Sequence, residues 1–343
     1  MQTNTCGYRN LILNRKKPVM LENHPSYLSL YKSGELWKRA DVLQKNLSAC
    51  TLCPWECRAD RTRGERGACR AATKIRVAKA IPHFGEEPPI SGTKGSGTIF
   101  FSFCSLNCCF CQNFQISQEN MGQDLSEKKL AQKMLSLQKM GCHNINLVSA
   151  SHFLPQIISA LCLAVESGLS LPLVYNTSGY ENLWTLKQLE GIIDIYLPDA
   201  KYSDDSAAQK YSGVKNYSNT NLLALKEMFR QVGHLKLDKN GIALSGLIVR
   251  HLVLPENLSN TKTILKNLKN AIGTELSISF MSQYKPCHKA LKDKALSLPL
   301  SKEEYIEAVD FLYALGFENG WVQDGVLDDK SFVPDFKKKN SWN

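Results

Sequence analysis

Residues 103–113 read Phe103-Cys104-Ser105-Leu106-Asn107-Cys108-Cys109-Phe110-Cys111-Gln112-Asn113, and Cys104, Cys108 and Cys111 have the spacing C-x3-C-x2-C. Three thiolates are one fewer than the four that usually hold a cubane iron–sulfur cluster, so one iron is left open to a ligand. The apolar run directly before the first cysteine is typical of a buried parallel strand. Cys109 lies inside the motif but outside its spacing, and we interpret it as a bystander.

Strand and helix patterns alternate from residue 98 onward. Strands are predicted over residues 98–103, 144–148, 171–175, 192–197, 247–254 and 276–281, with a short one at 321–323. Helices are predicted over residues 125–140, 154–166, 182–190, 219–232, 261–271 and 302–315. About six successive β/α units favour a parallel sheet with outer helices, open or curled, and are fewer than the eight units of a complete barrel.

The chain of 343 residues divides into four parts. Residues 1–48 are expected to form an N-terminal helical extension, and residues 49–96 a cysteine-rich candidate metal-binding segment that ends in a strap. The strap, over residues 81–97, is predicted as a loop because of its many prolines and glycines. Residues 97–325 are expected to form the core domain, and residues 326–343 a solvated tail.

The composition limits the compartment and the partners. Twelve cysteines, most of them in two groups with metal-ligand spacing, argue against a secreted disulfide framework and for a reducing cytoplasm. The chain has no signal-peptide pattern and no run of about 18 apolar residues, so we expect no membrane span. The net charge of +10 is consistent with a solvated surface, and it can also favour acidic partners. Nucleic acid is not expected, because no DNA- or RNA-binding motif accompanies the charge.

The second cysteine group precedes the core. Cys50, Cys53, Cys57 and Cys69 have the spacing C-x2-C-x3-C-x11-C, which can close a zinc site or hold a second cluster, and the thiol ligands do not distinguish the two. Four unliganded thiols are the alternative. The arginines of the same stretch can dock an acidic partner or form a solvated face.

The first cysteine triplet, with a strand before it, resembles the signature of radical S-adenosylmethionine (SAM) enzymes. More narrowly, the chain is similar to proteins related to the pyruvate formate-lyase activating enzyme over roughly residues 95–285. The matching segments occur in the family's order, and they are Cys111-Gln112-Asn113, residues 174–180, Asp199-Ala200-Lys201, residues 212–219 and residues 249–255.

The resemblance implies a partial (β/α)6 TIM-like barrel with a small cysteine-rich N-terminal extension. It also implies an oxidoreductase-type enzyme in which Cys104, Cys108 and Cys111 hold a [4Fe–4S] cluster that reductively cleaves SAM to a 5′-deoxyadenosyl radical. An electron donor such as flavodoxin or ferredoxin and, for an activase, a glycyl-radical enzyme are the implied partners. The alternatives are a radical SAM enzyme acting on a small molecule, peptide or RNA, and a zinc- or cluster-bearing nucleic-acid-binding module.

Site residues follow from the same resemblance. Polar residues expected at strand ends beside SAM are Ser149, Asn176, Thr177, Ser178, Asp199, Lys201 and Arg250. Arg250 can pair with the SAM carboxylate because a guanidinium matches a carboxylate bidentately. Residues 148–152 depart from the family's Gly-Gly-Glu segment, and their small side chains still permit close backbone approach. His152 in that segment is interpreted as a structural hydrogen bonder, and Phe103 stands where relatives have a small residue. No residue is assigned to acid–base or covalent catalysis.

Overall fold

The computed structural model describes residues 7–10, 25–324, 333–338 and 341, and it places a sheet of eleven strands at the centre of the molecule. The strands are β1 Tyr8–Asn10, β2 Ile75–His83, β3 Ser96–Phe101, β4 Gln123–Leu125, β5 Ile145–Val148, β6 Leu173–Thr177, β7 Ile195–Pro198, β8 Lys236–Leu237, β9 Ala243–Leu252, β10 Ser277–Met281 and β11 Gly320–Gln323. Their order across the sheet is β1-β11-β10-β9-β7-β6-β5-β3-β2-β4, with β8 paired to β9 outside this path.

The middle of the sheet is parallel. Strands β3, β5, β6, β7, β9, β10 and β11 pair in parallel with their neighbours, whereas β1, β2, β4 and β8 pair antiparallel. Within the described residues the sheet does not close, because β1 lies at one end of the path and β4 at the other. The predicted α/β class, with a mainly parallel and incompletely closed sheet, is confirmed.

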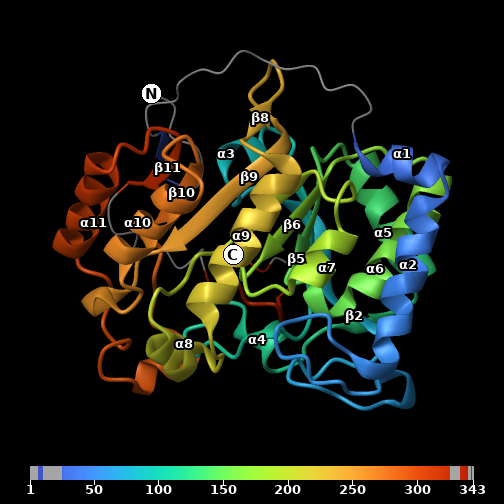
Figure 1. Ribbon diagram of the computed structural model, residues 1–343, viewed down its shortest axis with the longest axis horizontal. Coiled ribbons are helices and arrows are strands. Elements are labelled where there is room, and N and C mark those ends of the chain that lie inside the picture. Colours follow the sequence, from blue (N-terminus) through green and yellow to red (C-terminus); the bar gives the residue numbers. More distant parts are fainter. Residues whose placement is uncertain (1–6, 11–24, 325–332, 339–340, 342–343) are drawn as a thin grey trace.

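Helices cover the outside of the sheet. In Figure 1, α2, α5 and α6 lie at the right of the molecule, and α10 and α11 lie at the left. The helices are α1 Tyr27–Lys32, α2 Glu35–Lys45, α3 Pro88–Ser91, α4 Phe114–Ser117, α5 Glu127–Lys139, α6 Leu154–Glu166, α7 Leu183–Gln188, α8 Asp205–Ser212, α9 Tyr217–Val232, α10 Thr261–Ala271 and α11 Lys302–Ala314. Helix α6 is buried along most of its length because α5 and α2 both pack on it. None of the described helices is long and apolar enough to cross a membrane.

Local sequence signals account for most of these bounds. Helices α6 and α10 begin and end at the predicted residues. Helix α8 was not predicted, although Asp204 caps it by accepting a hydrogen bond from the Ser206 N–H, and Gly213 ends it in the left-handed conformation. An N-cap aspartate followed by a glycine after the last turn is a typical pair of helix boundary signals.

The predicted loop over residues 81–97 is wrong in part. Strand β2 continues to His83 and pairs with β3, and α3 follows it. Pro82 is accommodated because β2 lies close to the edge of the sheet, where a missing backbone donor is tolerated. The core sheet therefore extends across the boundary expected between residues 96 and 97.

Described segments near both ends of the chain also contact the sheet. Strand β1 pairs with β11, so part of the N-terminal extension belongs to the sheet edge. In the tail, Phe336 is buried and its ring packs edge-on against Phe100 at a centroid distance of 5.5 Å. Lys337 and Lys338 are exposed, as expected of a solvated tail. Most of the predicted tail lies outside the described residues.

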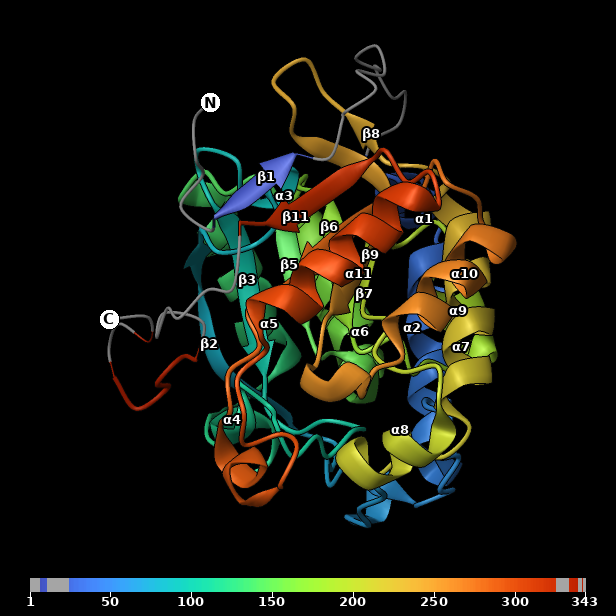
Figure 2. The same cartoon turned by 90° about the vertical axis from the view of Figure 1, so that its left-hand side faces the viewer.

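One end of the molecule gathers the loops that follow the parallel strands. Helices α4 and α8 lie at this end, together with the blue loop of residues 50–70, while β8 lies at the opposite end (Figures 1 and 2). Both cysteine groups are therefore at the same end of the sheet.

Candidate active site at the ends of the parallel strands

A cavity of about 540 Å³ opens at the carboxyl ends of the parallel strands. It is lined by all the residues predicted to bind the cluster or SAM, namely Cys104, Cys108, Cys111, Ser149, Asn176, Thr177, Ser178, Asp199, Lys201 and Arg250. These residues follow or end β3, β5, β6, β7 and β9, whose parallel pairing brings their carboxyl ends to one edge. Their roles toward a ligand stay predictions.

Each of the three cysteine sulfurs faces a hydrogen-bonding group. The Leu106 N–H donates to Cys104 Sγ at 3.4 Å, and the Ser212 hydroxyl donates to Cys108 Sγ at 2.9 Å. The Ser117 Oγ lies 3.2 Å from Cys111 Sγ. Such donors stabilise a thiolate, which is the form that ligates a metal. The donor set therefore fits an iron–sulfur cluster on three thiolates.

Without a metal these thiols are held protonated. Burial raises the pKa of Cys104 to about 12 and that of Cys111 to about 11, and the neighbouring Cys108 adds to both shifts. The Lys201 ammonium acts in the opposite direction on the pKa of all three thiols. Metal binding at this loop is thus coupled to the release of protons.

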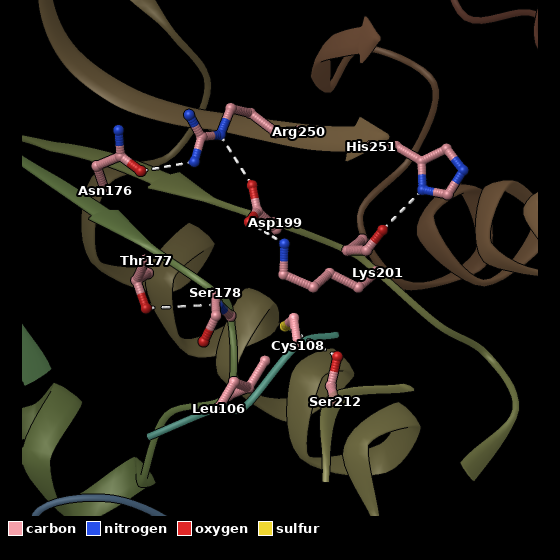
Figure 3. Close-up of polar contacts among 12 residues, drawn as sticks. Leu106, Cys108, Asn176, Thr177, Ser178, Asp199, Lys201, Ser212, Arg250 and His251 are labelled. Carbon is pink, nitrogen blue, oxygen red and sulfur yellow. Dashed lines mark hydrogen bonds and ion pairs between the residues drawn. The ribbon is translucent and has the colours of Figure 1, made fainter. Parts of the chain in front are cut away.

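A buried ionic network forms the wall opposite the cysteine loop (Figure 3). Arg250 Nε donates to Asp199 Oδ1 at 2.9 Å, and Lys201 Nζ donates to Asp199 Oδ2 at 2.6 Å. Arg250 Nη2 also donates to Asn176 Oδ1 at 2.6 Å. Burial alone raises the pKa of Asp199, but Arg250 and Lys201 outweigh it and the pKa is lowered. The carboxylate is therefore ionised and shared between two cations.

Glu86 is a cavity residue that the sequence analysis did not identify. Its Oε2 lies 3.6 Å from Arg250 Nη1, and its Oε1 accepts a hydrogen bond from Asn146 Nδ2 at 3.0 Å. Burial raises the pKa of Glu86, and Arg250 opposes that shift. Arg250 thus already has three protein partners, including Asn176, so any SAM carboxylate shares it with them. The sequence feature that could have identified Glu86 is the pair of adjacent acids Glu86-Glu87 within the strap of residues 81–97.

Two cavity residues have left-handed backbone conformations that favour glycine. Ser149 has φ of 56° and follows β5, and Phe103 has φ of 70° and precedes the first cysteine. Non-glycine residues seldom adopt this region, and a bulky side chain there is an outlier. Ser149 therefore keeps a glycine-like backbone in the segment, residues 148–152, where small side chains were expected to permit close backbone approach.

His152 does not line the cavity. It is buried, and its Nε2 lies 2.8 Å from the Ser102 carbonyl oxygen. Burial lowers the pKa of His152 to about 3, so the ring is neutral. The contact agrees with its interpretation as a structural hydrogen bonder.

Glu181 is a second buried acid that was not predicted. It accepts hydrogen bonds from Thr177 Oγ1 and, at 2.6 Å, from Ser151 Oγ. Tyr175 also donates to it, at 3.2 Å. Thr177 is thereby tied to the acid behind the cavity wall.

The second cysteine group lies outside this cavity. Cys50, Cys53 and Cys69 are buried and Cys57 is exposed. Within the described parts of the chain, no group of three or more histidine, cysteine, aspartate or glutamate side chains is arranged to hold a metal ion. This holds for the first triplet as well as for the second group.

Comparisons with known proteins find distant relatives. No protein-family model matches the chain. A curated protein of Methanocaldococcus jannaschii, described as "Uncharacterized protein MJ0674", is 28% identical over 295 residues, which cover 82% of this chain and 80% of that protein.

Solved structures match more weakly. The structure of the FeFe-hydrogenase maturase HydG from Carboxydothermus hydrogenoformans has a TM-score of 0.43 and 14% identity, and the match covers 63% of this chain and 55% of that one. Methylornithine synthase (PylB) has a TM-score of 0.42 and 16% identity, with coverage of 61% and 59%. The chain spans about half the length of HydG, 48% in a second structure of that maturase. The fold is accordingly assigned here from the strand pairing itself.

Proposed function

We propose that this protein is a radical SAM enzyme that binds a [4Fe–4S] cluster at Cys104, Cys108 and Cys111 and SAM in the adjoining cavity. The observation that carries the proposal is the convergence of the predicted residues on one cavity. Ten residues selected from five separate strand ends, on sequence grounds, all line one cavity of about 540 Å³. That volume is within the range of about 300–1,000 Å³ typical of small-ligand sites.

The chain's own residues prepare this cavity for charged ligands. When bound, the cluster supplies one electron to the SAM sulfonium and so yields a radical that abstracts a hydrogen atom. Lys201 places a positive charge near the three sulfurs, which compensates the negative charge of thiolates and so favours that form. The Asp199–Arg250 pair and Asn176 present fixed polar groups on the opposite wall.

Apolar side chains complete the cavity and limit the entry of water. They are contributed by β3, the cysteine loop, α4 and β5, and they include Phe100, Phe103, Leu106, Phe110, Ile116 and Val148. Exclusion of water strengthens the electrostatic interactions inside a site and protects reactive intermediates. Phe110, which directly precedes the last cysteine, lines the same cavity, and we propose that it lies near the adenine of SAM.

On the family resemblance, we propose further that the enzyme acts as an activase, which abstracts hydrogen from a glycine of a partner protein in the cytoplasm. A flavodoxin or ferredoxin is the proposed electron donor. A second candidate is a radical SAM enzyme acting on a small molecule, because the cavity has a size typical of small-ligand sites. A glycyl radical detected on a co-purified partner separates the first from the second.

The decisive experiment is anaerobic reconstitution with iron, sulfide, SAM and a strong reductant. The wild type is expected to release 5′-deoxyadenosine and methionine, and Cys104→Ala, Cys108→Ala and Cys111→Ala each to abolish both products. Cys109→Ala is the matched control in the same loop and should keep the activity. If the wild type forms neither product and instead binds DNA or RNA with steep salt dependence, the nucleic-acid-binding module replaces this proposal.

A further inference from the structure

Cys50, Cys53, Cys57 and Cys69 lie in a loop that folds back on itself through backbone hydrogen bonds. The Cys50 N–H donates to the Ala59 carbonyl, and the Arg58 N–H donates to the Cys50 carbonyl. The Cys57 sulfur lies against Gly67, because a Cβ added there would be 2.1 Å from it. Cys69, two residues further, interacts electrostatically with Cys50, Cys53 and Cys57. The fold therefore gathers all four thiols.

A buried cation accompanies the four thiols. Arg61 is 1% exposed, its Nη1 lies 3.8 Å from Cys50 Sγ, and its Nη2 donates to the Ala72 carbonyl. Its Nε has no hydrogen-bond partner among the described residues. A guanidinium stays charged in proteins, and a buried charge is unfavourable unless an anion compensates it. Neutral thiols provide no such charge, whereas a thiolate-bound centre does.

The position of the four thiols favours a cluster over a single zinc ion. Trp55 and Arg70 connect their loop directly to the first cysteine loop. Zinc has no redox chemistry, whereas an iron–sulfur centre beside the first one can carry electrons. We propose that Cys50, Cys53, Cys57 and Cys69 hold a second four-iron cluster, with Arg61 as its buried counter-charge.

The second centre is closed and lies next to the first. Four protein thiolates leave no open iron, which suits electron transfer. Trp55 Nε1 donates to the Ser105 carbonyl at 2.8 Å, and Arg70 Nη2 donates to the Ser117 carbonyl at 2.6 Å, so the two cysteine loops are in direct contact. In this position, with Cys57 exposed, the second cluster accepts one electron from an external one-electron carrier protein and passes it to the first cluster. This relay role rests on the proposed function, whereas the metal site does not.

The test uses the full chain with the first site removed. Cys104→Ala/Cys108→Ala/Cys111→Ala protein, reconstituted anaerobically, is expected to retain about four irons and four sulfides per chain. On reduction it should give an electron paramagnetic resonance signal that SAM does not alter. Adding Cys53→Ala should abolish iron and signal, and adding Cys142→Ala, at a buried cysteine far from both loops in sequence, should preserve them. One zinc per chain, or four titratable thiols without metal, overturns the proposal.

If the variant without the first site fails to fold, the iron content of proteins that keep this site provides a second test. Wild-type protein reconstituted in the same way is expected to contain about eight irons per chain, and Cys53→Ala protein about four. Wild-type protein that saturates at four irons, with a signal fully altered by SAM, overturns the second cluster while leaving the first intact. Loss of SAM cleavage with eight irons present overturns the proposed function and leaves the second cluster standing.

Discussion

The Arg250 guanidinium donates from Nε to Oδ1 of Asp199 across 2.9 Å, and this bond joins β9 to the residue that follows β7 at the wall of the cavity. The backbones of the two residues also form a parallel bridge. Both side chains are mostly buried, at 17% and 14% exposure. A buried pair of this kind holds two strand ends in register and also gives the cavity its fixed charges.

We expect Asp199→Asn to lower the free energy of unfolding by about 3 kcal/mol, because breaking a buried ion pair leaves the cations Arg250 and Lys201 uncompensated. Chemical denaturation at neutral pH measures the change. The exposed pair Lys262–Glu307 offers a matched control, and Lys262→Met should change the free energy by no more than about 1 kcal/mol. Equal stability of Asp199→Asn and wild type would contradict the proposed role of the pair.

Glu181 predicts a pH dependence of stability in the direction opposite to that of a salt-bridged acid. Burial raises the pKa of Glu181 to about 7, although Ser151, Thr177 and Tyr175 act against the shift. The unfolded chain loses this proton near pH 4.3, so between about pH 4.3 and 7 the folded state binds more protons and stability falls as the pH rises. Glu181→Gln should remove this contribution to the slope. Denaturant melts at pH 5 and pH 8 measure it, and an unchanged difference between the two pH values argues against the assignment.

The hydrogen bond from Ser212 to Cys108 predicts an effect on cluster retention. Ser212 Oγ lies 2.9 Å from the sulfur, and loss of a hydrogen-bond donor to a metal ligand typically reduces metal affinity about 10- to 100-fold. We expect Ser212→Ala to lose iron to a chelator roughly tenfold faster than wild type, at the same initial iron content. Ser206→Ala, at the exposed start of α8, is the control and should release iron at the wild-type rate. Indistinguishable rates for the two variants would show that the bond does not support the ligand.

The left-handed conformation of Ser149 predicts which substitutions the end of β5 accepts. At a φ of 56°, glycine relieves a strain of about 1–2 kcal/mol, part of which is offset by the greater freedom of glycine in the unfolded chain. Ser149→Gly should therefore match the wild type in thermal unfolding to within about 1 kcal/mol. Ser149→Val should be destabilised by more than about 1 kcal/mol, because a β-branched residue is strained in this region. A fully stable Ser149→Val protein would rule out the strained backbone.

Local patterns predicted the strands and helices well where each element carries its own signal. Residues 154–166 and 261–271 were predicted as helices with the observed bounds, because the spacing of apolar residues and the flanking residues act over a few positions. Strand β2 was missed because a strand that pairs antiparallel at the sheet edge, and contains Pro82, lacks the continuous apolar pattern of the buried strands. Its pairing with β3 depends on a partner outside the local sequence.

The residues of the candidate site also fall into two groups, those that the sequence predicts and those that only packing brings together. The sequence alone determined the three-thiol motif and the polar strand ends, because ligand spacing in a single loop is a local property, and because parallel strands place their carboxyl ends at one edge. Only the tertiary structure decided that Glu86 joins Arg250 in the cavity and that Arg61 is buried beside the Cys50 thiol. Those contacts arise when elements distant in the chain pack together and buried charges must find partners, and no spacing along the sequence encodes that requirement.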